Sequence, residues 1–90
     1  MQNKEKEKSS RVTVSILNEE YVIIGKAQEK HINEVAAYVD YKMRELTLRH
    51  PNLSPTKVAV LTAINIADEY LRLQQDHQAL IRLLDEESNR

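Results

Sequence analysis

The feature that most constrains this chain is its C-terminal part, which has no glycine and no proline after Pro55. A helix running from residue 55 to about residue 86 would be roughly 48 Å long, because an α-helix rises about 1.5 Å per residue. A 90-residue chain is too small to build a core that covers such a helix. We therefore expect the far half of this helix to project from the folded domain.

The apolar pattern of this helix changes along its length. In "VAVLTAINIADEYLRL", residues 58–73, apolar side chains fall on almost every side. One line of positions alternates spacings of four and three, as the seam of a coiled coil does, and it consists of Ala59, Ala63, Ile66, Tyr70, Leu73, His77, Leu80 and Leu84. A second line runs beside it only in the first half and consists of Val60, Ile64, Ala67 and Leu71. This pattern is typical of a globular head followed by a protruding coiled-coil tail.

We expect Val60, Ile64 and Ala67 to meet both the chain's own head and a neighbouring chain. The full set of positions predicted to mediate self-association is Val60, Ile64, Ile66, Ala67, Tyr70, Leu73, His77, Leu80 and Leu84. The alternative is a monomer in which the long helix folds back on an earlier helix over residues 29–49. That helix, at about 33 Å, is too short to cover all of the long one. For His77, the alternatives are a polar group that sets the register of the seam and an exposed histidine.

The first half of the chain predicts a short tail and a β-hairpin. Residues 1–10 are polar or charged after the initial methionine and are expected to form a disordered tail. From residue 11 the pattern alternates, which predicts a half-buried strand, and "YVIIG" at residues 21–25 predicts a second. Residues 18–20 between them are short enough only for a hairpin turn, in which Asn18 is the residue best suited to a positive φ. A two-stranded hairpin needs cover from helices or from another chain.

A helix over residues 29–49 follows from a stripe of apolar positions. The stripe consists of Ile32, Val35, Ala36, Val39, Met43 and Leu46. Pro51 ends the helix near His50, and Ser54 followed by Pro55 is a favourable start for the long helix. The fold class is therefore α+β, with a head over residues 11–62 and a coiled-coil tail over residues 63–90.

Composition excludes several classes of function. The chain has no cysteine, which rules out disulfides and thiolate metal sites. His31, His50 and His77 have no spacing that would gather them on one metal, so we expect neither a metal nor a cofactor. No catalytic arrangement of side chains is suggested, and the chain is not expected to be an enzyme. The absence of cysteine fits a reducing compartment, so we expect a cytoplasmic protein. No apolar run approaches the ~20 residues that span a bilayer, so we expect no membrane insertion.

A local excess of basic side chains is the most functional-looking surface feature. It consists of Lys42, Arg44, Arg49 and Lys57, with His50 among them. One interpretation is a patch for an acidic protein partner. Another is that Arg44 and Arg49 only form helical pairs with Asp40 and Glu45. A nucleic-acid-binding module is a third, but the net charge of −1 and the absence of interleaved aromatic residues count against it.

Three segments carry a resemblance to a known family. "RVTVSILNEEYVI", "HINEVAAYVDYKMREL" and "VAVLTAINIADEYLRL" resemble the ZapA family of bacterial cell-division proteins over about residues 11–75. The resemblance implies a head with a hairpin and a helix, and a long helix that dimerises, with two dimers meeting as an antiparallel dimer of dimers. It also implies binding to the tubulin-like GTPase FtsZ, whose filaments family members crosslink at the mid-cell division septum. A generic coiled-coil dimerisation adapter is the alternative.

The resemblance also implies where the head meets the filament. It places this surface near the hairpin turn and the start of the long helix, which here gives Glu19, Thr56, Lys57 and Leu61. Basic residues near the end of the first helix have a similar role in the family, and they match Arg44 and Arg49. Where the family often has a glycine and a basic residue in the turn, this chain has Asn18 and Glu19.

Overall fold

The computed structural model describes residues 9–88 and contains two strands and two helices. Strands β1 (Ser10–Ile16) and β2 (Glu19–Gly25) are followed by helices α2 (Glu29–Arg49) and α3 (Pro55–Ser88). The tail expected over residues 1–10 lies mostly outside the described residues, and Ser10 already pairs with Gly25 in the hairpin. The predicted α+β fold of a hairpin, a helix and a long helix is confirmed. In the described part of the chain, neither helix combines the length and apolarity needed to cross a membrane.

The hairpin turn is tighter than the sequence suggests. The strands are antiparallel, and their register pairs Ile16 with Glu19, so only Leu17 and Asn18 lie in the turn. Strand β2 therefore begins two residues before the expected position. Asn18 has the predicted positive φ, at 67°, and Leu17 has one as well, at 49°. Positive φ at both central residues is typical of a type I′ turn, whose backbone twist matches the right-handed twist of the strands.

Helix α2 covers the hairpin through β1. Val12 and Val14 of β1 are buried against Ile32 and Ala36 of α2, and Ile16 and Ala27 pack at the edge of this cluster. The register places Tyr21 and Ile23 of β2 on the same face as Val14 and Val12. They nevertheless remain 48% and 37% exposed, because α2 does not reach them. Val35 was expected in the buried stripe of α2 but is exposed.

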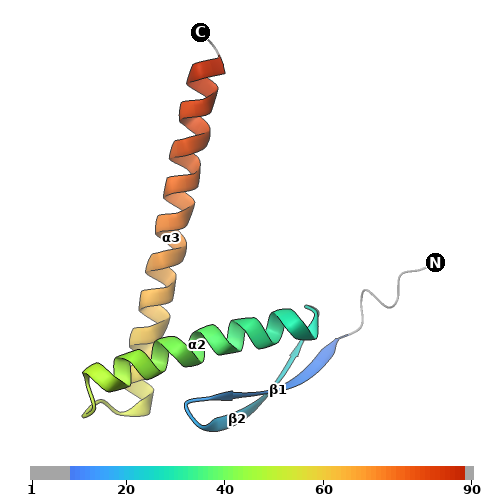
Figure 1. The fold of residues 1–90 in the computed structure, drawn as a ribbon, viewed down its shortest axis with the longest axis vertical. Coiled ribbons are helices and arrows are strands. Elements are labelled where there is room, and N and C mark those ends of the chain that lie inside the picture. Colours follow the sequence, from blue (N-terminus) through green and yellow to red (C-terminus); the bar gives the residue numbers. More distant parts are fainter. Residues whose placement is uncertain (1–8, 89–90) are drawn as a thin grey trace, which may run out of the picture.

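Helix α3 leaves the head soon after its first turns. Figure 1 shows α2 crossing the lower part of α3, while the rest of α3 projects away from the hairpin. The radius of gyration is 18.4 Å, whereas a compact chain of this length has one of about 12 Å. Among residues 55–87 of α3, only Val58 and Thr62 are buried, and Thr62 lines a groove together with Met43 of α2. The projection expected from helix length is present.

Candidate interaction surfaces

One end of the head gathers the hairpin turn, the C-terminal half of α2 and the start of α3 (Figure 1). Ser54 sets the start of α3, because its hydroxyl accepts the backbone N–H of Lys57 at 3.2 Å and Pro55 needs no such partner. An open groove lies between the hairpin and α3. Its lining consists of Ile16, Leu17, Glu19, Tyr21, Val22, Ile23, Val39, Met43, Pro55, Thr56 and Ala59.

This groove brings together two of the six residues that the resemblance assigns to partner binding. Glu19 and Thr56 both line it. Lys57 is exposed next to Thr56, and Arg49 is exposed at the last turn of α2. Leu61 is 39% exposed, so it is not a core residue of the single chain. The six residues therefore occupy one end of the head without forming a single pocket.

Arg44 is engaged by neighbouring groups. Its Nε donates to Oδ2 of Asp40 at 3.0 Å, as the spacing of four residues predicts, and its Nη2 donates to Oδ1 of Asn18 at 3.0 Å. The other oxygen of Asp40 accepts the backbone N–H of Leu17 at 2.7 Å. That N–H, followed by Arg44, holds the pKa of Asp40 below its ordinary value. Sequence spacing finds the pair within the helix but gives no sign that both side chains reach the hairpin turn.

Lys42 is engaged on the other side of α2. Its Nζ donates to Glu69 of α3 at 2.5 Å, and the hydroxyl of Tyr38 donates to the second oxygen of the same carboxylate. The Lys42 contact lowers the pKa of Glu69, and the contact with Glu69 raises the pKa values of Lys42 and Tyr38. Lys42 also lies 5.6 Å from the centre of the Tyr38 ring. This group ties α2 to α3, and the sequence analysis missed it because its partners are 27 and 31 residues apart.

The predicted basic patch is thus smaller than its composition suggests. The expected ion pair of Glu45 with Arg49 does not form. Glu45 instead accepts the hydroxyl of Tyr41 at 2.8 Å, which raises the pKa of Tyr41. Lys42 and Arg44 are both in ion pairs. Among residues 9–88, this leaves Arg49 and Lys57 as the exposed basic side chains of the patch without an ion pair. Few charges remain to neutralise phosphates, which argues against the nucleic-acid interpretation.

A second groove, almost entirely apolar, continues from the first between α2 and α3. The two share Val39, Met43 and Ala59. The second is also lined by Thr62, Ala63, Ile66, Ala67 and Tyr70, so it contains three of the nine positions predicted to mediate self-association. Leu73, His77, Leu80 and Leu84 lie further along α3 and are exposed. The apolar side of α3 is therefore exposed from Tyr70 to Leu84.

The expectation that Val60 and Ile64 meet the chain's own head is wrong, whereas Ala67 lines the second groove together with Val39 and Met43 of α2. Val60 and Ile64 are more than half exposed, and Ala67 is exposed in the second groove. The stripe that meets α2 begins instead with Val58 and Thr62, which are 1% and 2% exposed. Val58 and Thr62 each lie one residue before a position of the predicted seam, Ala59 and Ala63. Helix α2 crosses α3 rather than running along it, so it covers a different side of α3 from the seam.

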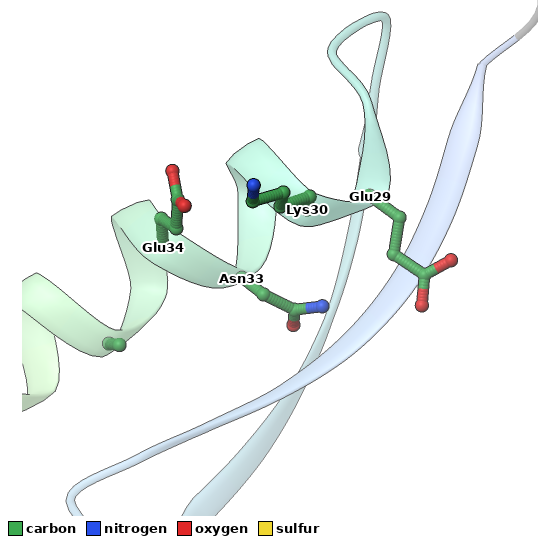
Figure 2. Close-up of a pocket in the computed structure, with 5 residues that line it drawn as sticks. Glu29, Lys30, Asn33 and Glu34 are labelled. Carbon is green, nitrogen blue, oxygen red and sulfur yellow. The ribbon is translucent and has the colours of Figure 1, made fainter.

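No small-molecule site emerges from the described residues. A shallow depression on the first turns of α2 is lined by Glu29, Lys30, Asn33, Glu34 and Ala37. Figure 2 shows that the carboxylates of Glu29 and Glu34 point away from each other, so these side chains do not converge on one ligand. No cluster of histidines and carboxylates in residues 9–88 is suited to hold a metal ion.

Known proteins with similar sequences belong to one family. The family model described as "Cell division protein ZapA" matches residues 12–90. A ZapA from Bacillus anthracis is 41% identical over 78 residues, which cover 87% of this chain and 88% of the relative. One from Geobacillus sp. (strain WCH70) is 41% identical over 83 residues, covering 92% and 95%. These relatives are named as cell-division proteins and not as enzymes.

Two solved structures resemble the fold. A ZapA mutant dimer from Geobacillus stearothermophilus has a TM-score of 0.69 and 44% sequence identity, and the match covers 86% of this chain and 90% of that one. An unknown conserved bacterial protein from Pseudomonas aeruginosa PAO1 has a TM-score of 0.61 and 30% identity, with 91% and 100% covered. With the family model matching most of its length, this chain belongs to the ZapA family of cell-division proteins.

Proposed function

We propose that this protein binds FtsZ and crosslinks its filaments at the mid-cell division septum, on the cytoplasmic side. The observation that carries the proposal is the uncovered apolar side of α3. Ile66, Tyr70, Leu73, Leu80 and Leu84 fall on one seam, and α2 reaches only the first two of them. A rod that associates through this seam holds several heads at fixed separations, as a crosslinker requires.

Self-association proceeds in two stages. The apolar groove between α2 and α3 takes part of a second copy and makes a homodimer, in line with the dimer described for the Geobacillus stearothermophilus relative. The far part of α3, with Leu73, His77, Leu80 and Leu84, then joins two dimers antiparallel. A two-fold axis across the tails places pairs of heads at opposite ends of the assembly. Weak contacts of single heads then act together on neighbouring filaments.

The filament contact lies at the end of the head that carries the first groove. Glu19 and Thr56 line the groove, and Arg49, Lys57 and Leu61 are exposed around it. The two unpaired basic residues suit a partner with an acidic surface. Arg44 belongs to the same end but is engaged by Asp40 and Asn18.

A bundling experiment tests the function. Purified protein is mixed with FtsZ and GTP, and light scattering and pelleting at low centrifugal force report bundled polymer. We expect both to rise, and we expect the double variant Arg49→Ala/Lys57→Ala to reduce the rise. The matched control is Lys30→Ala/Arg72→Ala, which removes two positive charges elsewhere. Pelleting that stays at the level of FtsZ alone would contradict the proposal and favour an adapter for another partner.

A further inference from the structure

We propose that Asp40 is a positioning residue that holds the Leu17–Asn18 turn in its left-handed conformation, and that Arg44 acts on the filament through this turn. The inference rests on the proposed function, because the turn leads directly into Glu19 on the surface assigned to FtsZ. It differs from the expectation drawn from the family resemblance, in which Arg44 is itself a contact.

The turn needs support because of its residue types. Leu17 and Asn18 have φ values of 49° and 67°. An L-residue in this region brings its Cβ close to the following carbonyl oxygen, and turns of this kind normally use Asn-Gly or Gly-Gly for that reason. Asn18 is among the tolerated residues, whereas Leu17 is not. The sequence alone therefore does not favour the conformation that the hairpin adopts.

Three hydrogen bonds supply the support, and together they form a latch of Asp40 and Arg44 on the turn. Oδ1 of Asp40 accepts the N–H of Leu17 at 2.7 Å, a group that the two-residue turn leaves outside the strand ladder. Oδ2 of Asp40 accepts Nε of Arg44, and Nη2 of Arg44 donates to Asn18, both at 3.0 Å. The fork of the guanidinium thus joins the carboxylate to the turn, and both central turn residues are bound to α2.

The latch fixes the positions of the residues that the head exposes at the end with the hairpin turn. Leu17 and Glu19 line the first groove on either side of Asn18, so a turn that relaxed would move both out of place. Two donor groups of Arg44 are committed to Asp40 and Asn18, and its charge is paired with the carboxylate of Asp40. Its contribution to a partner is therefore the shape of the turn and not an unpaired positive charge.

Hydrogen exchange in the full-length protein tests the latch without any partner. In Asp40→Ala, we expect the backbone amide of Leu17 to exchange at least about tenfold faster in NMR spectra, since its acceptor is gone. Asp40→Asn keeps an oxygen near this amide but loses the charge, and it is the second variant if Asp40→Ala is poorly folded. The matched control is Asp68→Ala, which removes the acid of an equivalent Asp-Arg pair on α3 that touches no turn. Unchanged exchange of Leu17 in both Asp40 variants would overturn the latch.

Binding to FtsZ polymer tests the positioning role. We expect Asp40→Ala to weaken co-pelleting by about tenfold, on the order of the cost of one L-residue in the left-handed region. In the same background, Leu17→Asn/Asn18→Gly installs the most favourable sequence for this turn, and we expect it to restore binding.

The outcomes separate the two proposals. A released Leu17 amide with unchanged binding, or a loss of binding that the Asn-Gly turn does not restore, would overturn the positioning role. If the unaltered protein does not bind FtsZ, the proposed function fails and the positioning role fails with it. The exchange of Leu17 still decides whether Asp40 holds the turn.

Discussion

The head and the far half of α3 bury similar side chains to very different extents. In the head, Val12, Val14, Ile32 and Ala36 are less than a tenth exposed, because β1 and α2 cover one another. Residues 71–87 of α3 are all exposed, although leucine recurs along one side. Burial of a leucine side chain is favourable by about 1.5–3 kcal/mol, whether it is buried in a core or against a second helix. Because the tail is exposed in the single chain, the proposed self-association predicts that tail stability depends on protein concentration and that head stability depends on it less.

Truncating a buried side chain of the head should have the largest effect and tests the contrast between the head and the tail. We expect Ile32→Ala to lower the free energy of unfolding by about 3 kcal/mol, since it removes buried methyl groups and leaves a cavity between α2 and β1. Leu48→Ala is the control on the same helix, because Leu48 is 81% exposed, and it is expected to change stability by about 0.5 kcal/mol or less. Urea denaturation measures both. Equal effects would contradict the assigned core.

The next effect is a charge in the tail. Leu80→Glu places a carboxylate in the seam, where association would bury it without a partner, so we expect tail association to weaken about a hundredfold. Light scattering of the variant alone should then give a lower mass than that of the unaltered protein. With FtsZ and GTP, the variant should produce less bundled polymer. Thermal unfolding of the head should change little. A mass equal to that of the unaltered protein would show that Leu80 lies outside any interface.

A smaller effect concerns Thr62, where α3 meets the head. Its Oγ1 is buried and has no hydrogen-bond partner within the described chain. We expect Thr62→Val to raise the free energy of unfolding by about 1 kcal/mol, because it removes an unsatisfied polar group and keeps the shape. Thr47→Val is the matched control, since the Thr47 hydroxyl donates to the carbonyl of Met43 at 3.0 Å and its loss should destabilise. A loss of stability in Thr62→Val would contradict the assignment.

The smallest expected effect is a dependence of head stability on pH. The pKa of Asp40 is below its ordinary 3.8, mainly because its carboxylate accepts the backbone N–H of Leu17. The pKa of Glu69 is below its ordinary 4.5, mainly because its carboxylate accepts a hydrogen bond from Lys42. A carboxyl group with a lowered pKa in the folded state stabilises it above its ordinary pKa, and this contribution is lost as pH falls through the folded value. We therefore expect urea midpoints to decrease below about pH 4.5. The double variant Asp40→Asn/Glu69→Gln should be less stable at neutral pH and should show a flatter acid profile; an unchanged profile would contradict the assignment.

Local patterns predicted the elements, and contacts between distant residues account for what they missed. The seven-residue repeat from Ile66 to Leu80 and the alternation of β1 are periodic within one element, so the sequence contains them. The latch joins Leu17 to Asp40 across 23 positions, and the tie of α2 to α3 joins Lys42 to Glu69 across 27. Neither has a periodic signature. The crossing of α2 over α3 likewise decides that Val58, and not Val60, faces the head.

The measurement that tests the central claim most directly is the mass of the protein in solution as a function of concentration, by sedimentation equilibrium. If other copies cover the apolar side of α3, the mass will exceed the 10.5 kDa of one chain at tens of micromolar and rise further with concentration. Leu80→Glu will lower it. A mass of 10.5 kDa across that range would show that the seam is not an interface between copies and would contradict the account.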